Sequence, residues 1–136
     1  MKISANMKVL IIDDMAVMRK YTKKALRDVG LKNIHEAANG KEAFEFVQNA
    51  HGSGDPVEFI ISDWNMPVMS GLNLLELLRS DKRFSNIPFL MVTAEASGDQ
   101  VKAAIDKGVD HYIVKPFSPD ILRNKLEFIF KKLGAK

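Results

Sequence analysis

The sequence contains no cysteine, which excludes disulfide bonds and thiolate metal sites. Long apolar runs are also missing, since none approaches the roughly 18 residues that a membrane-spanning helix needs. The first six residues, MKISAN, lack the apolar core of a secretion signal. Repeats and low-complexity segments are absent as well. These absences predict a cytoplasmic protein that does not contact a membrane.

The composition is that of an ordinary globular protein. Hydrophobic residues make up 46% and charged residues 27% of the chain, which excludes a disordered protein. The length of 136 residues is typical of one domain, so we expect residues 1–136 to form a single domain.

The net charge of +3 is unevenly distributed along the chain. Residues 16–32 contain six basic side chains and one acidic one, and residues 121–136 contain five basic and one acidic. The rest of the chain is therefore acidic overall. A positive net charge alone would suggest nucleic-acid binding. No helix-turn-helix pattern accompanies the basic segments, so no nucleic-acid partner is expected.

Short apolar runs alternate with amphipathic stretches along the whole sequence. The runs at 9–12, 59–62, 89–92 and 112–114 are nearly continuous in apolar and β-branched residues, and a weaker run spans 34–37. Such runs are typical of strands that are buried on both faces of a parallel sheet.

The stretches between these runs have the spacing and end residues of helices. A first helix is expected to end at Gly30, and Asn39 with Glu42 forms a capping box for a second. A leucine-rich helix covers 72–78, a shorter one covers 101–105, and Ser118-Pro119 starts a last helix that runs to about 133. Five alternating strand–helix units predict a doubly wound α/β fold with a parallel sheet between helices.

Polar side chains follow four of the five predicted strands. Asp13 and Asp14 follow the first, Asp63 the third, Thr93 the fourth and Lys115 the fifth. Ligands bind beyond the carboxyl ends of the strands in open parallel sheets. Three carboxylates attract a hard cation such as Mg²⁺, and a hydroxyl and an ammonium group suit phosphoryl oxygens. A single Asp after a strand is more often a turn former, but the recurrence predicts a phosphoryl site in which one carboxylate is the nucleophile.

The ordered set of segments resembles the receiver domain of two-component response regulators, especially its single-domain chemotaxis members. The resemblance covers about residues 7–133 and implies a flavodoxin-like five-stranded sheet in the order 2-1-3-4-5. It rests on the following segments: Asp13-Asp14, Ser62-Asp63-Trp64-Asn65-Met66-Pro67, Gly71, residues 90–96 and residues 112–117.

The resemblance implies a role for each residue at the strand ends. Asp63 would accept a phosphoryl group from a histidine kinase, and Thr93 and Lys115 would bind its oxygens. The peptide between Lys115 and Pro116 is expected to be cis. Mg²⁺, for which Mn²⁺ could substitute, would be held by the following groups: Asp13, Asp14, Asp63 and the backbone carbonyl of Asn65.

Further residues are implied to switch or tune the protein. Phosphorylation would draw Thr93 toward the site and let Tyr112 turn inward, which would remodel the face of the fourth helix, fifth strand and fifth helix. Asn65, Ala94 and Glu95 lie at positions that tune dephosphorylation in this family.

The implied protein is a monomeric signalling phosphoacceptor rather than an enzyme. Its expected partners are a histidine kinase, a phosphatase, and an output protein such as a flagellar motor switch component. No output domain is expected in the chain, so the protein would act by contact with a partner or, alternatively, as a phosphorelay intermediate. An alternative of a different class is a Mg²⁺-dependent phosphatase of the haloacid dehalogenase type. Met15 stands where that family needs a second Asp, which argues against it.

Overall fold

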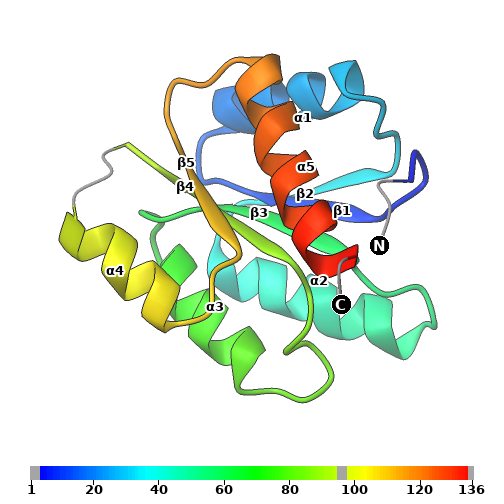
Figure 1. Cartoon of the computed structure of the whole chain (residues 1–136). Coiled ribbons are helices and arrows are strands. Elements are labelled where there is room, and N and C mark those ends of the chain that lie inside the picture. Colours follow the sequence, from blue (N-terminus) through cyan, green and yellow to red (C-terminus); the bar gives the residue numbers. More distant parts are fainter. Residues whose placement is uncertain (1–3, 95–97, 135–136) are drawn as a thin grey trace.

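A computed structural model describes residues 4–94 and 98–134. Within them, strands and helices alternate along the chain (Figure 1). Their bounds are as follows: β1 Val9–Ile12, α1 Ala16–Asp28, β2 Ile34–Ala37, α2 Gly40–Gly52, β3 Phe59–Asp63, α3 Gly71–Arg79, β4 Phe89–Thr93, α4 Gly98–Asp106, β5 His111–Val114 and α5 Pro119–Gly134.

The strands form one parallel sheet in the order β2-β1-β3-β4-β5, which confirms the predicted fold and strand order. The continuous apolar residues of β1, β3 and β4 are explained by their central positions, where every residue is buried. β2 and β5 lie at the two edges and are only partly buried. The carboxyl ends of all these strands therefore meet at one edge of the molecule.

Two hydrophobic cores lie on opposite faces of the sheet. Figure 1 shows α1 and α5 on one face and α2 and α3 on the other. The α1/α5 core contains Leu26 and Leu126, and the α2/α3 core contains Val47 and Leu75, all fully buried. Alternate residues of each central strand supply the two cores, because successive strand side chains point to opposite faces.

Local residues mark where the helices begin. The side chain of Asn39 accepts a hydrogen bond from Glu42 N–H at 2.9 Å, and Ser118 Oγ accepts one from Ile121 N–H at 3.2 Å. Both predicted N-caps are thus confirmed. The α1 helix differs: in the described chain its N-cap residue, Met15, makes no side-chain capping bond.

Some details differ from the predictions. The glycine-rich segment 51–56 is typical of a loop after the second helix, but α2 runs to Gly52 and so includes the first two of these residues. Ile105 and Ile121 fit the helical pattern but are 59% and 46% exposed, because no element covers that side of α4 and α5 in the described chain. His35 has no metal-ligand spacing and is typical of a surface residue, but it is half-buried against Phe46.

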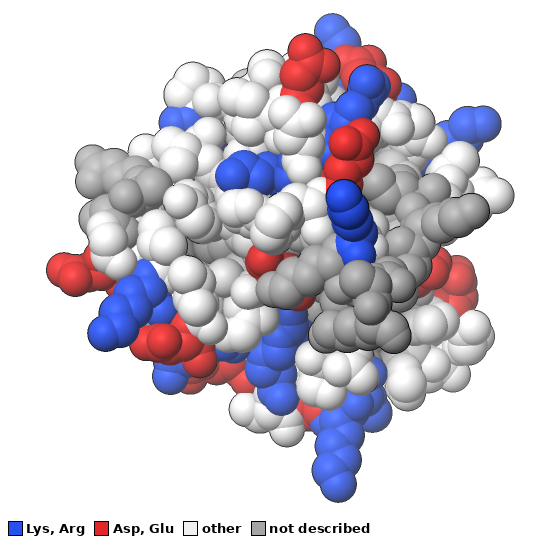
Figure 2. All heavy atoms as spheres, in the orientation of Figure 1, with Lys and Arg blue, Asp and Glu red and all other residues white. Residues whose placement is uncertain are grey.

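The surface charges are mixed on the face shown in Figure 2, where basic and acidic side chains are interspersed with uncharged surface. Within residues 4–94 and 98–134, no helix is both long and apolar enough to cross a bilayer.

Candidate functional site

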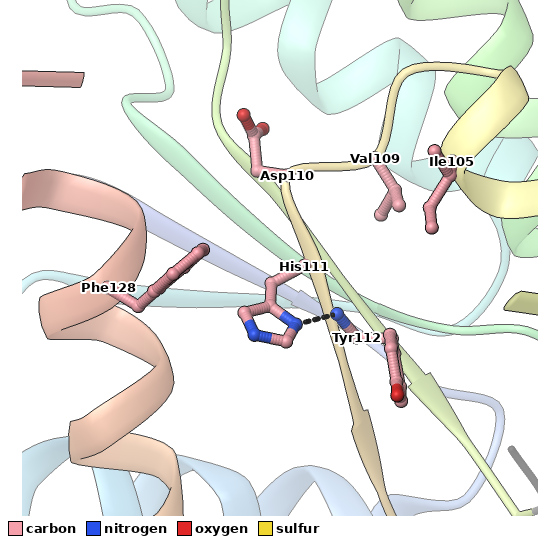
Figure 3. A pocket seen from close by; sticks show the side chains of 6 residues that line it. All are labelled: Ile105, Val109, Asp110, His111, Tyr112 and Phe128. Carbon is pink, nitrogen blue, oxygen red and sulfur yellow. Dashed lines mark hydrogen bonds between the residues drawn. The ribbon is translucent and has the colours of Figure 1, made fainter. Parts of the chain in front are cut away.

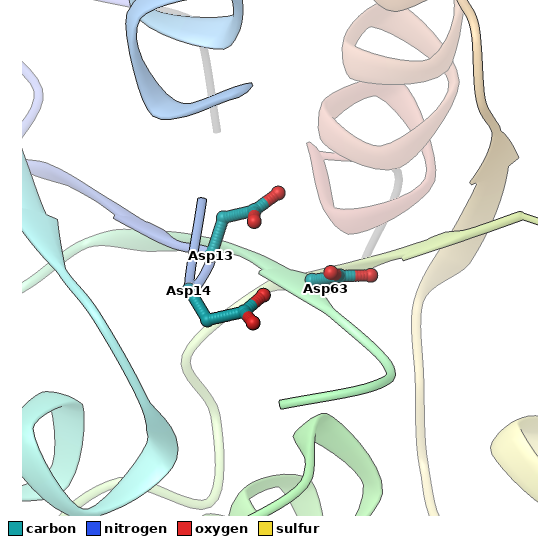
Figure 4. A group of neighbouring side chains, drawn as sticks. All are labelled: Asp13, Asp14 and Asp63. Atoms are coloured by element: carbon teal, nitrogen blue, oxygen red, sulfur yellow. The ribbon is translucent and has the colours of Figure 1, made fainter. Parts of the chain in front are cut away.

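Three carboxylates converge at the carboxyl ends of β1 and β3 (Figure 4). Asp13, Asp14 and Asp63 each place a carboxylate oxygen within 4.8 Å of the others. Asp13 and Asp63 are buried, whereas Asp14 is exposed. The cluster therefore opens toward solvent on the Asp14 side.

Strand register brings the remaining strand-end residues to the same edge. Ile12 pairs with Ser62, so Asp13 and Asp63 each lie one step beyond a paired position. Asp63 itself pairs with Val92, and Thr93 pairs with Val114. Thr93 and Lys115 thus each follow one step further along the neighbouring strands. The parallel register explains why residues far apart in sequence share one site.

Lys115 reaches back across the sheet to the carboxylates. Its Nζ lies 3.1 Å from Asp63 Oδ2 and 3.5 Å from Asp13 Oδ2. It donates a hydrogen bond to Asp63 while remaining half-buried itself. The ammonium group therefore compensates part of the negative charge of the cluster.

Burial is the largest influence on the acidity of Asp63, and it raises the pKa of this carboxyl above its usual value of 3.8. The neighbouring Asp13 carboxylate raises it further, whereas the charge and hydrogen bond of Lys115 lower it. Since the raising effects prevail, the surroundings of Asp63 stabilise its charged form less than water does. A divalent cation bound to Asp63 would favour the charged form.

The loop that carries Lys115 is held by contacts with α1. The peptide between Lys115 and Pro116 is cis, as expected. Phe117 is buried, and its carbonyl accepts a hydrogen bond from the Tyr21 hydroxyl. The Tyr21 and Phe117 rings also pack edge to face, with centroids 5.6 Å apart. The position of Lys115 thus depends on the first helix.

A cavity of about 210 Å³ lies beyond the carboxyl ends of β3 and β4 and is lined by Asn65, Thr93, Ala94 and Gln100. Thr93 Oγ1 donates a weak hydrogen bond of 3.4 Å to Gln100 Oε1 on α4. Ala94, whose side chain is small, leaves this cavity open. Glu95, which was expected to tune the site, lies outside the described residues.

Tyr112 lies at a second concavity, formed by α4, β5 and α5 (Figure 3). This cavity has a volume of about 280 Å³ and is mostly apolar. His111 packs edge to face against Phe128 with centroids 4.9 Å apart, so it is half-buried. The cavity is lined by the following residues: Ile105, Val109, Asp110, His111, Tyr112 and Phe128.

Sequence reasoning assigned no structural role to two residues that shape the site, Gly71 and Arg19. Gly71 N–H donates a hydrogen bond of 2.9 Å to the Trp64 carbonyl, and a Cβ at Gly71 would collide with the Asp63 carbonyl oxygen. Arg19 donates a hydrogen bond of 2.6 Å to the Asp13 carbonyl. A glycine at the start of a predicted helix is a signal for the close contact at Gly71. No such signal distinguishes Arg19, which is one of several basic side chains on the first predicted helix.

The donor set fits a hard divalent cation. Carboxylate oxygens are the ligands that Mg²⁺ and Mn²⁺ prefer, and the exposed carboxylate of Asp14 makes the cluster accessible from solvent. The three carboxylates Asp13, Asp14 and Asp63 could therefore hold a metal ion.

Known proteins share both the sequence and the fold of this chain. The family model of the response regulator receiver domain matches residues 9–127. The chemotaxis protein CheY of Pseudomonas aeruginosa is 42% identical over 129 residues, which cover 95% of this chain and all of that protein. The chain in the high-resolution structure of the chemotaxis response regulator CheY4 of Vibrio cholerae is 33% identical, with a TM-score of 0.80, and the match covers 91% of this chain and 98% of that one.

A further similar structure is the CheX-CheY-BeF₃-Mg²⁺ complex from Borrelia burgdorferi. The matched chain has a TM-score of 0.82 and 26% identity, over 90% of this chain and 88% of that one. Sequence and structure therefore agree: this chain belongs to the response regulator receiver domain family and is homologous to the CheY chemotaxis response regulators of phosphorylation-activated two-component signalling.

Proposed function

We propose that Asp63 is the phosphoacceptor of this receiver domain and that a histidine kinase supplies the phosphoryl group. The observation that carries the proposal is the ion pair of 3.1 Å between Asp63 and Lys115 beside two further carboxylates. This arrangement places a nucleophilic oxygen next to a positive charge and a candidate metal site, which are the groups that phosphoryl transfer requires.

In the proposed reaction, one oxygen of the Asp63 carboxylate attacks the phosphorus of a phosphohistidine. The new O–P bond forms as the P–N bond breaks, and the electron pair of that bond returns to the histidine nitrogen. Lys115 and the Thr93 hydroxyl bind the phosphoryl oxygens. A bound Mg²⁺ would offset the negative charge of the phosphoryl group. Its proposed ligands are Asp13, Asp14, Asp63 and the backbone carbonyl of Asn65.

Phosphorylation is proposed to act on the output face through Thr93 and Tyr112. The Thr93 hydroxyl moves toward the phosphoryl group and leaves Gln100, to which it now donates. Tyr112 then turns inward from the cavity between α4 and α5. Asn65 and Ala94 line the cavity next to Asp63, so they are positioned to control how easily water or a phosphatase removes the phosphoryl group. We assign Glu95 to the same role from the family resemblance.

The proposed output is contact of the α4-β5-α5 face with a cytoplasmic protein. The similar structure from Borrelia burgdorferi is a complex of CheX, CheY, BeF₃ and Mg²⁺, which supports a protein partner for this receiver domain. Homology to chemotaxis proteins favours a flagellar motor switch component as that partner. Transfer of the phosphoryl group to another protein, as in a phosphorelay, is the alternative output.

Phosphorylation by acetyl phosphate with Mg²⁺ tests the proposal. Mass spectrometry of the parent protein is expected to show a gain of one phosphoryl group. Asp63→Asn should remove this gain, because its amide cannot act as the nucleophile. Asp28→Asn, at an exposed position at the end of α1, is the matched control and should be modified like the parent. Equal modification of Asp63→Asn and the parent would refute the assignment of Asp63.

A further inference from the structure

Arg19 connects the Asp13-Asp14 turn to β2, one of the two edge strands of the sheet. Its Nη1 donates a hydrogen bond of 2.6 Å to the backbone carbonyl of Asp13, and its Nε donates one of 3.1 Å to Glu36 Oε1 on β2. The Arg19 side chain is 19% exposed, and its bond to Asp13 is partly shielded from water, whereas its bond to Glu36 is exposed. One guanidinium group thus holds two points that are distant in the sequence.

The carbonyl that Arg19 binds belongs to the peptide unit between Asp13 and Asp14. A peptide unit is planar, so a bond that fixes its carbonyl also fixes the direction in which the chain leaves toward Asp14. Asp13 N–H donates to the Ala37 carbonyl at 3.2 Å, and Asp13 Oδ1 accepts from Met15 N–H at 2.9 Å. In this network Arg19 is the contact from α1 to the backbone between the two acids.

Glu36 anchors the other end of Arg19. It pairs with Arg19 at 3.1 Å and with Lys23 at 3.6 Å, while Lys23 forms no hydrogen bond or ion pair with the Asp13-Asp14 turn among the described residues. The two basic residues therefore share one carboxylate, but the hydrogen bond to Asp13 comes from Arg19. Lys23 is for this reason a matched control for the effect of charge.

We propose that Arg19 is a positioning residue for the metal site: it orients the Asp13-Asp14 turn so that both carboxylates face the cation. This inference rests on the proposed function, because it assumes that the cluster binds Mg²⁺. A planar guanidinium can donate in two directions at once, whereas a lysine ammonium at the same position cannot reproduce this geometry. Outer contacts that orient metal ligands commonly change metal affinity by about 10-fold to 100-fold.

The alternative is that Arg19 acts only through its charge, and it predicts the opposite sign. A positive charge near three carboxylates disfavours a second cation, so its removal should strengthen Mg²⁺ binding. Loss of the positioning contact should instead weaken Mg²⁺ binding. The direction of the change therefore separates the two explanations.

The test is a Mg²⁺ titration of the parent, Arg19→Lys, Arg19→Gln and Lys23→Gln, followed by the fluorescence of Trp64. Trp64 adjoins Asp63 and is the only tryptophan in the sequence. We expect Mg²⁺ dissociation constants about 10-fold higher for both Arg19 variants and nearly unchanged for Lys23→Gln. Unfolding midpoints in EDTA should stay close to that of the parent, which would separate positioning from a general loss of structure.

Each other outcome has a definite meaning. Parent-like Mg²⁺ affinity of Arg19→Lys, or tighter binding by Arg19→Gln, would overturn the positioning role. An equal loss of Mg²⁺ affinity in Lys23→Gln would also overturn the positioning role. The loss would then come from weaker ion pairing with Glu36, which Arg19 and Lys23 share, and not from the bond to Asp13. If the parent itself shows no saturable response to Mg²⁺ in fluorescence or in its unfolding midpoint, the proposed metal site fails instead.

Discussion

The surroundings of Asp63 have opposing effects on the pKa of its carboxyl group. Burial and Asp13 raise its pKa, and Lys115 lowers it, with the raising effects prevailing. A raised pKa means that the folded state holds the proton more tightly than the unfolded chain does. As the pH rises above 3.8, the usual pKa of this group, ionisation of Asp63 therefore costs the metal-free protein stability.

We expect Asp63→Asn to stabilise the protein at neutral pH in the absence of divalent cations. The neutral amide avoids the cost of a buried charge, while Lys115 keeps Asp13 as a partner at 3.5 Å. The gain should shrink as the pH falls through the raised pKa of Asp63 and should disappear below 3.8, because Asp63 is then protonated in both states of the parent. Urea unfolding of both proteins from pH 3 to pH 8 in EDTA measures the difference. A difference that does not depend on pH would contradict this explanation.

At the scale of single residues, the sequence predicted which side chains approach one another but not what supports them. Asp13, Asp63, Thr93 and Lys115 follow apolar runs, and parallel register alone brings strand ends together. The contacts of Arg19 and Tyr21 depend on how α1 lies against the sheet. Helical periodicity specifies the apolar face of a helix, but it does not specify which polar side chain reaches a given backbone carbonyl.

Among the elements, α3 packs unusually close to the end of β3. Gly71 begins the helix directly behind Asp63, and its N–H donates to the Trp64 carbonyl at 2.9 Å. There is no space for a side chain here, because a Cβ would collide with the Asp63 carbonyl oxygen and would lie 3.1 Å from Met91 Sδ. The glycine therefore allows the helix to support the backbone of the proposed phosphoacceptor.

Gly71→Ala is expected to destabilise the protein by about 1–3 kcal/mol, the usual cost of overpacking a well-packed site. Because the displaced group is the backbone of Asp63, the rate of phosphorylation by acetyl phosphate should fall as well. The matched control is Gly52→Ala at the end of α2, where a Cβ would meet nothing within 4 Å. Urea unfolding and phosphorylation kinetics provide the two measurements. Parent-like behaviour of Gly71→Ala would show that the helix can shift without affecting the site.

The types and order of the helices and strands were easier to predict than which of their apolar side chains are buried. Strand runs and caps such as Asn39 are local features, so the order of elements followed from the sequence. Ile105 and Ile121 lie at apolar positions of the helical pattern, yet their side chains are exposed. An apolar position indicates a face that can be covered, but tertiary arrangement decides whether another element covers it.

At the scale of the whole molecule, cation binding should be linked to folding. The carboxylates come from β1 and β3, which are adjacent only in the assembled sheet. A ligand that binds only the folded state stabilises it by about 2.7 kcal/mol at a concentration 100 times its dissociation constant. For a domain of this size, that corresponds to an increase in Tm of about 10 °C.

Thermal unfolding with EDTA and with saturating Mg²⁺ measures this linkage. The parent and the control Asp28→Asn should both show the increase, whereas Asp14→Asn should lose most of it. A Tm that does not respond to Mg²⁺ in the parent would argue against a cation site formed by Asp13, Asp14 and Asp63.

The two cores on opposite faces of the sheet also differ in when they can be completed during synthesis. The α2/α3 core uses residues up to Met91, so most of it is available once β4 has been made. The α1/α5 core includes Phe59, which packs against Phe130 of α5 with ring centroids 5.4 Å apart. The part of this face that α5 covers therefore stays exposed until α5 emerges from the ribosome. Exposed apolar sheet surface promotes aggregation, so the α1/α5 face is where the nascent chain most needs protection.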